Sequence, residues 1–411
     1  MTGTDEFFAL SGVRVLDLSR VLAGPWATQI LADLGAEVIK IEKPGSGDDT
    51  RQWGPPWLQY GSDATPQSAY FLSANRNKKS VAVDVTTQEG QSLVRELAAR
   101  CDILVENFKA GGLQKYGLDY ESLSALNPRL IYCSITGFGQ DGPLADRPGY
   151  DFVIQGMSGL MSITGAPGEF EGSEPQKVGV ALADVMTGLY AAIGVLAALN
   201  QRRATGQGQY IDLALFDCAV ACLANQALNF LVSGTAPQRL GNAHPNIVPY
   251  QVFATADGHI VLAVGNDAQF RRFCALTGEV SLGTDPRFVT NAARVANRRE
   301  LVAIIEKLVR TRTTAEWLAK LDKANIPCGP INDIGEAFSE AQAKARGLAL
   351  ELVDAAGNTI PGVRNPLRMQ GLAQQAASAP PVLGQDTAAV LCDLLGKSEE
   401  DLASLHAAAV I

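Results

Sequence analysis

The first half of the chain alternates short apolar runs with helix-like patterns, and this alternation limits the fold more than any other feature of the sequence. The apolar runs predict strands at 13–19, 36–43, 80–85, 102–108 and 129–139. Helices are predicted between them, at 25–34 and 88–99. Strands that alternate with helices form a parallel sheet with helices packed on its faces. Ligands of such sheets bind beyond the carboxyl ends of the strands, so the candidate binding loops follow Ser19, Lys43, Phe108 and Gly139.

After about residue 205 the pattern changes and predicts a second, smaller domain. A strand at 259–264 precedes helices near 267–277, 297–310 and 314–324. We therefore predict an α/β protein with a large Rossmann-like parallel-sheet domain and a smaller α/β domain. The predicted parts are the start of the large domain at 1–220, a linker at 221–258, the small domain at 259–325, a second linker at 326–345, and a C-terminal part at 346–411 that returns to the large domain.

Charge, cysteines and histidines argue against several classes of protein. The formal net charge of the 411 residues is −9, which disfavours a general nucleic-acid binder. Seven scattered cysteines without a CxxC motif, and a start at 1–10 unlike a signal peptide, predict a cytoplasmic protein. The three histidines, His244, His259 and His406, share no metal-binding spacing, so no metal site is expected. The loop after the first strand lacks GxGxxG, so a nicotinamide cofactor loses support.

Basic residues collect in the first half of this acidic chain. They are Lys43, Arg51, Arg76, Lys78, Lys79, Lys109 and Lys115. Cations at the ends of strands favour a small polyanionic ligand. The alternative is an ordinary solvated face, because charged runs are usually that.

One long apolar stretch, at 179–199, is interrupted by a single charge, Asp184. The stretch predicts a buried helix, and an aspartate before an apolar run is a favoured N-cap. A carboxylate in that position could also act as a nucleophile. The stretch is long enough to span a membrane, but Asp184, Thr187 and three glycines argue against a span.

Seven motifs, in this order, carry a resemblance to a known family. They are VLDLSRVLAGPWATQILADLGAEVIKIEKPGSGDDTR (15–51), NRNKKSVAVD (75–84), VENFKAGGL (105–113), ITGFGQDGPLADRPGYD (135–151), ALADVMTG (181–188), TGQGQYIDLAL (205–215) and IPCGPI (326–331). The chain resembles the class III CoA-transferases, the CaiB–BaiF family, over essentially its whole length.

The resemblance implies a mechanism in which Asp184 matches the family's catalytic aspartate. Its carboxylate would attack an acyl-CoA thioester, and an aspartyl-CoA thioester would then pass CoA to an acceptor acid. CoA and acyl-CoA are thus implied as substrates, with no prosthetic group. The resemblance also implies a homodimer of interlocked rings, whose linkers near 220–258 and 325–345 thread through the partner chain.

The resemblance further implies a set of CoA-contacting residues. Leu22 and Ala23 match positions along the pantetheine path, and Tyr150 and Asp151 match residues beside the thioester. Lys43 and Lys115 match positions near the phosphates of CoA, and Val83, Val85 and Thr86 match positions near its adenine. The remaining positions are Arg20 and a CoA-binding turn formed by Asn107, Phe108 and Lys109. Thr86 stands where some relatives have lysine. Taken singly, Leu22, Val83 and Phe108 are more typical of core residues.

Departures from the family pattern narrow the expected reaction. Racemases of the family carry a histidine base in a G-H-D segment, whereas this chain has GYD at 149–151. Tyrosine is a poor base at neutral pH, which favours CoA transfer over racemisation. Leu22 and the sequence at 263–270 differ from the oxalate enzymes. We therefore expect succinyl-CoA as donor and a dicarboxylate such as glutarate or itaconate as acceptor.

Two alternatives stay open at this point. The first is an acyl-CoA racemase or epimerase of the same family, and the second is a nucleotide-binding module without chemistry. The distal carboxylate of a dicarboxylate needs a cation, for which Arg20, Arg51 and Arg76 are candidates. For any one of these arginines, an ordinary surface charge is the simpler explanation.

Overall fold

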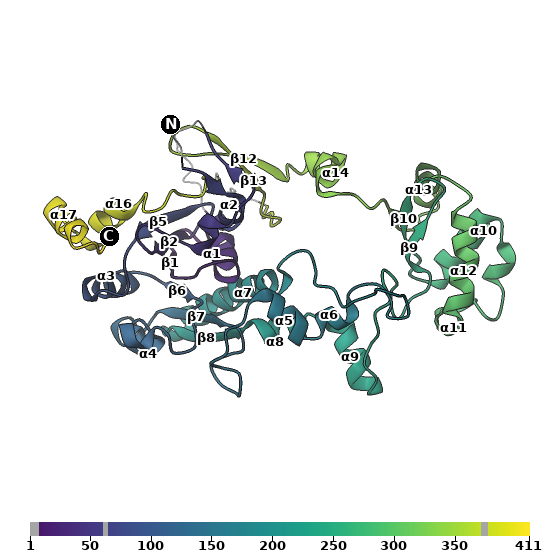
Figure 1. The fold of residues 1–411 in the computed structure, drawn as a ribbon, viewed down its shortest axis with the longest axis horizontal. Coiled ribbons are helices and arrows are strands. Elements are labelled where there is room, and N and C mark those ends of the chain that lie inside the picture. Colours follow the sequence, from purple (N-terminus) through teal and green to yellow (C-terminus); the bar gives the residue numbers. More distant parts are fainter. Residues whose placement is uncertain (1–7, 61–64, 371–376) are drawn as a thin grey trace. The chain divides into compact units, whose positions relative to one another are not determined.

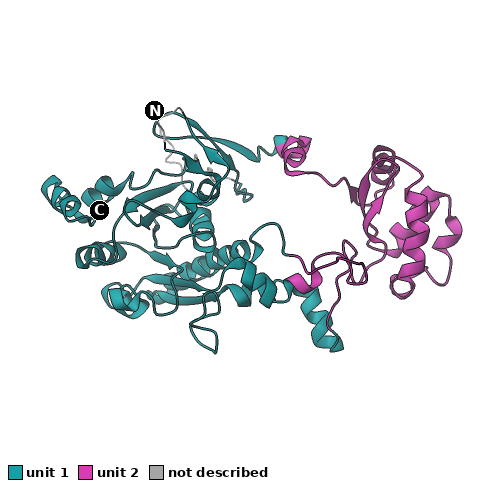
Figure 2. Ribbon diagram, in the orientation of Figure 1, with its two compact units in different colours: residues 1–160, 177–235, 344–411 teal, residues 161–176, 236–343 magenta. Residues whose placement is uncertain are grey.

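The computed structural model describes residues 8–60, 65–370 and 377–411, which form two compact units (Figure 2). Unit 1 takes the described parts of 1–160, 177–235 and 344–411. Unit 2 takes 161–176 and 236–343. Each unit has its own core, and the chain passes from one to the other four times.

Unit 1 is built on a six-stranded sheet in which every neighbouring pair of strands is parallel. The strands, in spatial order, are β5 (Lys78–Ala82), β2 (Glu37–Glu42), β1 (Arg14–Asp17), β6 (Ile103–Glu106), β7 (Ile131–Thr136) and β8 (Gln209–Ala214). The predicted parallel sheet is thus confirmed. The direction of strand progression reverses between β1 and β6, and ligands of such sheets bind outside the carboxyl ends at that reversal.

Helices cover both faces of the sheet (Figure 1). Successive strand residues point to opposite faces, so Val15 joins one core and Leu16 the other. The first face carries α1 (Ala23–Asp33), α7 (Leu182–Thr205) and α8 (Leu215–Ala221). The second carries α3 (Gln88–Ala98), α4 (Tyr120–Leu126) and α16 (Thr387–Leu395).

Helix α7 is the long apolar helix that the sequence predicts. By length and composition it could cross a membrane, but a core helix passes the same test. Here it packs on α1, where Gly188 allows a close approach: a Cβ at this position would lie 2.7 Å from the carbonyl oxygen of Ala23. Ala191 and Val195 of the same helix are buried against the sheet. The packing therefore gives the apolar run a core role within unit 1.

Unit 2 contains a three-stranded antiparallel sheet in the order β11 (Cys328–Gly329), β10 (His259–Ala263), β9 (Tyr250–Ala254). Its helices are α10 (Asp267–Thr277), α11 (Asn291–Ala296), α12 (Arg298–Val309) and α13 (Thr314–Lys323). The three helices predicted near these positions are confirmed. Trp317, Phe270 and Phe253 are fully buried in the core of this unit.

The remaining elements are short. They are β3 (Trp57–Leu58), β4 (Gln67–Ser68), α2 (Ala69–Ala74), α5 (Asp151–Met157), α6 (Leu160–Ile163), α9 (Ala224–Ser233), α14 (Ile334–Ser339), α15 (Ala341–Ala345), the hairpin β12 (Ala349–Val353) and β13 (Thr359–Val363), and α17 (Glu399–Ala407). The end of the chain packs beside β5, where the Asp84 amide donates to the Val410 carbonyl at 2.8 Å.

Candidate active site

The loops after β1 and β6 are joined at the point where the strand order reverses. The Arg20 amide donates to the Asn107 side-chain oxygen at 2.8 Å, and the Asn107 side-chain nitrogen donates back to the Arg20 carbonyl at 2.6 Å. The Arg20 guanidinium also lies 5.6 Å above the ring centre of Phe108. The structure therefore brings together Arg20, Asn107 and Phe108, three of the predicted CoA-contacting residues, from two separate loops.

A buried ion pair holds the loop after β1. The Lys40 ammonium lies 2.9 Å from the Asp48 carboxylate, and both side chains are fully buried. Lys40 also donates to the Ser19 carbonyl at 2.8 Å, and the Val21 amide donates to Asp48 at 3.2 Å. Val21 has φ of 69°, which is unusual for a β-branched residue and is maintained only where surrounding contacts enforce it. Leu22 and Ala23, which follow, are buried at the start of α1.

Asp184 lies in the first turn of α7 and does not cap it, so the N-cap prediction was wrong. The helix begins at Leu182, and the capping position belongs to Ala181, which has no side-chain cap. The free amides of this turn are taken by another residue: Ala183 donates to an Asp151 carboxylate oxygen at 2.8 Å, and Asp184 donates to the same oxygen at 3.4 Å. Asp151 thus binds the free amides that an N-cap side chain would otherwise bind, and the Asp184 carboxylate does not cap the helix.

The carboxylate of Asp184 makes no polar contact within the described part of the chain. Within residues 8–60, 65–370 and 377–411, no side chain or amide donates a hydrogen bond to its oxygens, and no cation pairs with it. Burial raises the pKa of Asp184 to about 7, and the nearby charge of Asp151 adds to the rise. A carboxylate without hydrogen-bond donors or a counterion retains the electron density that a nucleophile needs.

Side chains of helix α5 form hydrogen bonds with the segment that leads into α7. Gln155, which is fully buried, donates to the second Asp151 oxygen at 2.7 Å and to the Val180 carbonyl at 3.3 Å. Its side-chain oxygen accepts from the Val178 amide at 2.9 Å. Tyr150, the N-cap residue of α5, is 67% exposed. In the GYD segment, therefore, the aspartate points toward Asp184 and the tyrosine is largely in solvent.

Tyr70 is a candidate site residue that the sequence analysis missed. Burial raises its pKa to about 12, and the charges of Asp184, Asp151 and Asp48 contribute to the rise. The phenol stays protonated at neutral pH and is therefore a hydrogen-bond donor in a region that carries the negative charges of these three acids. Its ring meets that of Trp53 edge-on, with centroids 5.2 Å apart. No sequence motif marks Tyr70, because only the packing of the short helix α2 brings it near α7.

The predicted adenine-side residues follow the end of β5, and the predicted phosphate-side Lys43 follows the end of β2. Val83 is buried in the core, and Val85 is partly buried against the same core. Thr86 is exposed and donates to the Asp84 carboxylate at 2.7 Å. Hydrogen bonds from Thr86 lower the pKa of Asp84, and the charge of Lys43, which is exposed after the end of β2, adds to that lowering. Lys43 and the Asp84–Thr86 turn therefore lie near one another on neighbouring strands.

The other predicted cations differ in what they contact. Lys109 is exposed and lines a cavity of about 340 Å³, and Lys115 is exposed beside the ring of Tyr116. Among the candidates for a distal carboxylate, Arg51 and Arg76 pair with buried acids, Glu42 and Asp33 respectively. Arg20 pairs with Asp49, but both side chains are about half exposed. Of the three candidates, Arg20 thus has the most solvent-exposed ion pair, and its charge contributes least to holding the fold together.

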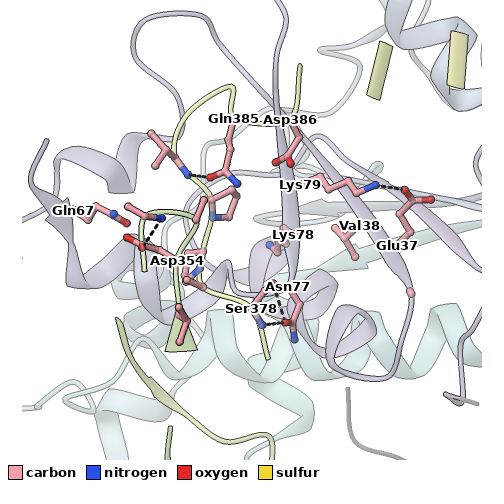
Figure 3. A pocket seen from close by; sticks show the side chains of 18 of the residues that line it. Glu37, Val38, Gln67, Asn77, Lys78, Lys79, Asp354, Ser378, Gln385 and Asp386 are labelled. Atoms are coloured by element: carbon pink, nitrogen blue, oxygen red, sulfur yellow. Dashed lines mark hydrogen bonds and ion pairs between the residues drawn. The ribbon is translucent and has the colours of Figure 1, made fainter. Parts of the chain in front are cut away.

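A cavity at the opposite end of the strands is lined by none of the predicted catalytic or CoA-contacting residues, but Lys78 and Lys79 of the predicted basic group line it. It has a volume of about 480 Å³ and lies between the amino ends of β2 and β5 and the segment 378–386 (Figure 3). Several of its polar groups already have partners: Lys79 pairs with Glu37, and Asp386 accepts from the Ser80 amide. In the parts of the chain that the structure describes, no group of three metal-ligating side chains occurs.

Comparisons with known proteins agree with the resemblance seen in the sequence. The model of CoA-transferase family III matches residues 10–387. Succinate–glutarate CoA-transferase of Agrobacterium fabrum is 51% identical over 385 residues, which cover 94% of this chain and 95% of that protein. Succinyl-CoA:glutarate CoA-transferase of Mus musculus is 45% identical, with 99% and 91% covered.

A solved structure supports the same relation at the level of the fold. The CAIB/BAIF family protein from Brucella suis is 50% identical and superposes with a TM-score of 0.82. The match covers 94% of this chain and 99% of that one. With a family match over most of its length and relatives of this similarity, the chain belongs to CoA-transferase family III and is an enzyme of the CoA-transferase type.

Proposed function

We propose that this enzyme moves CoA from succinyl-CoA to a dicarboxylate such as glutarate or itaconate, through an aspartyl-CoA thioester on Asp184. The observation that carries the proposal is the Asp184 carboxylate, which is partly buried and has no hydrogen-bond donor or cation among the described residues. The named activities of the relatives from Agrobacterium fabrum and Mus musculus support succinyl-CoA and glutarate as substrates.

The proposed chemistry needs no external acid or base. An ionised Asp184 oxygen attacks the thioester carbon of the donor, and the carbon–sulfur bond breaks to give a mixed anhydride and CoA thiolate. The thiolate attacks the aspartyl carbonyl, and the donor acid leaves as a carboxylate. The acceptor carboxylate then attacks the aspartyl-CoA thioester and forms a second anhydride. The released thiolate attacks the acceptor's acyl carbon, which gives the new acyl-CoA and regenerates the Asp184 carboxylate.

The surroundings of Asp184 suit these steps. Each intermediate is activated toward water, and the apolar first turns of α7 limit access of water to the carboxylate. Asp151 and Gln155 fix the backbone that carries Asp184. We assign to the Tyr70 hydroxyl the role of a neutral donor toward oxygens that gain negative charge during the reaction.

The distal carboxylate of the acceptor is assigned to Arg20. This guanidinium lies at the reversal of strand order, above Phe108, and its partner Asp49 is half exposed. A planar guanidinium can bind a carboxylate through two hydrogen bonds. Glutarate and itaconate would exchange with Asp49 for this group, whereas a monocarboxylate would leave the Arg20–Asp49 pair intact.

We further propose that the enzyme is a homodimer of interlocked rings, as the family resemblance implies. Large apolar side chains are exposed on the isolated chain: Leu231 is 72%, Val232 84% and Ile334 80% exposed. Such residues mark surfaces that associate with another chain. Light scattering on the purified protein tests this, with a mass of one chain as the contradicting result.

The function is tested by measuring, by mass spectrometry, CoA transfer from succinyl-CoA to a panel of mono- and dicarboxylic acids. We expect transfer to dicarboxylates and its loss in Asp184→Ala, with Asp146→Ala as an exposed control. Full activity in Asp184→Ala would refute the role of this residue. The same reaction in deuterated water without an acceptor tests racemisation, for which uptake of deuterium at the α-carbon would be required.

A further inference from the structure

Glu106 is a buried acid that lies outside the surroundings of Asp184 and has no part in the chemistry above. It is the last residue of β6 and is 5% exposed. Within the described residues, no lysine or arginine forms an ion pair with it. A buried carboxyl group without a cation is costly, so its hydrogen bonds must account for its place in the fold.

Both oxygens of Glu106 accept hydrogen bonds from groups near the carboxyl ends of the strands. One accepts from the Phe108 amide at 2.7 Å, and the other accepts from the Ser134 hydroxyl. Ser134 lies directly opposite Glu106 in the β6–β7 pairing. The bond to Phe108 closes a tight turn over Asn107, so the Glu106 side chain defines the start of the loop after β6.

Ser134 extends these contacts to the loop after β7. Its oxygen accepts from the Gln140 side chain at 2.9 Å, and the Gln140 amide donates to the Asp212 carboxylate at 3.2 Å. A continuous chain of hydrogen bonds therefore runs from the Phe108 amide through Glu106 and Ser134 to Gln140. Because Asn107 also binds the backbone of Arg20, Glu106 connects three loops at this edge of the sheet.

From this arrangement we infer that Glu106 is a positioning residue for CoA, which sets the loop after β6 through its bonds to Phe108 and Ser134. The inference rests on the proposed function and on the CoA contacts that the family resemblance implies for Asn107, Phe108 and Lys109. Without an acceptor at residue 106, the Phe108 amide loses its hydrogen-bond partner. The start of the loop after β6 is then no longer fixed. CoA would then bind more weakly, while the reaction at Asp184 would proceed at a similar rate once CoA is bound.

Hydrogen bonding, and not a permanent charge, is what this position requires. Burial raises the pKa of Glu106 to about 7, so both protonation states are populated at neutral pH. Either state can accept from the Phe108 amide. A glutamine side chain has the same shape, accepts through its oxygen and can donate to Ser134 through its nitrogen. Glu106→Gln should therefore preserve the loop, whereas Glu106→Ala should not.

The test is the dissociation constant of free CoA, measured by calorimetry at pH 7. We expect binding to weaken about tenfold or more in Glu106→Ala and to stay within about threefold of the natural protein in Glu106→Gln. Ser134→Ala should give an intermediate loss. Glu121→Gln changes an exposed acid that lines the same cavity, and should bind CoA normally. The turnover number with saturating acyl-CoA should change less than the KM in Glu106→Ala and Ser134→Ala, the two variants expected to weaken binding.

Three results would overturn the inference: normal CoA affinity in folded Glu106→Ala, equal weakening in Glu106→Gln and Glu106→Ala, or normal affinity in Ser134→Ala. The third applies even where Glu106→Ala does not fold. Failure of the proposed function is distinguishable, because it would appear as full turnover in Asp184→Ala, independently of how residue 106 affects CoA affinity.

Discussion

Replacing Asp151 with asparagine should move the acid side of the pH–activity profile to lower pH. In the proposed reaction Asp184 attacks as a carboxylate, and its pKa is about 7. For the natural protein, kcat/KM for succinyl-CoA should therefore fall tenfold per pH unit below about pH 7. Asp151 contributes to that pKa through its negative charge, since its oxygen lies 3.4 Å from the Asp184 amide.

The size of the shift follows from the repulsion between the two carboxylates. Like charges about 4–6 Å apart, the range over which neighbouring carboxylates shift one another's pKa, repel by about 3–4 kcal/mol at an effective dielectric constant of about 20, and one pKa unit corresponds to about 1.4 kcal/mol. Asp151 is partly exposed, and solvent weakens the repulsion. We therefore expect the midpoint to fall by about one pH unit in Asp151→Asn. It should not reach the ordinary aspartate value, because burial of Asp184 remains.

The assay is the pH dependence of kcat/KM between pH 5 and 9, and the observable is the midpoint of the acid limb. The plateau is expected to drop as well, because an asparagine nitrogen would face the Gln155 donor, but that drop does not alter the midpoint. Asp146→Asn and Glu106→Gln should leave the midpoint in place. An unchanged or higher midpoint in Asp151→Asn would refute the assignment of this limb to Asp184.

Three further changes test the packing and electrostatics. The raised pKa of Asp184 means that its contribution to stability is present below about pH 4 and is lost as the pH rises through 7. Asp184→Asn should therefore increase the free energy of unfolding at pH 8 by up to about 4 kcal/mol and leave it unchanged at pH 4. Urea unfolding at the two pH values measures this. Gly188→Ala should lower the free energy of unfolding by about 1–3 kcal/mol in the same assay, because its Cβ would meet the backbone of α1. The control Gly194→Ala, whose Cβ would have its nearest contact at 3.6 Å, should not lower it. Equal effects of the two substitutions would contradict this packing. Lys40→Met should lower the free energy of unfolding by about 3–5 kcal/mol, because Asp48 would stay buried without its partner, and a loss below about 1 kcal/mol would show that the pair does not hold the loop.

The parallel sheet could be predicted because its signals are local. Val15 and Leu16 alternate between two cores, and such buried strands appear in the sequence as short continuous apolar runs. The long apolar helix was visible for the same reason. The reversal of strand order between β1 and β6 could not be predicted, since it depends on which strands pair over long sequence distances.

The candidate site could be predicted only in part. Asp184 stood out because a lone charge interrupts an apolar run, but its environment depends on α5, a separate helix. Asp151 takes the amides that a local cap would bind, which is why the N-cap prediction failed. Gln155 and Tyr70 were missed because neither belongs to a recognisable pattern, and tertiary packing alone brings them to the start of α7.

The central claim is that the Asp184 carboxylate carries CoA during the reaction. The most direct measurement is mass spectrometry of the protein after incubation with succinyl-CoA alone, followed by digestion and identification of the modified peptide. The account predicts a CoA adduct on the peptide that contains Asp184, and its loss on addition of glutarate with formation of glutaryl-CoA. Absence of an adduct under conditions of full turnover, or an adduct on another residue, would contradict it.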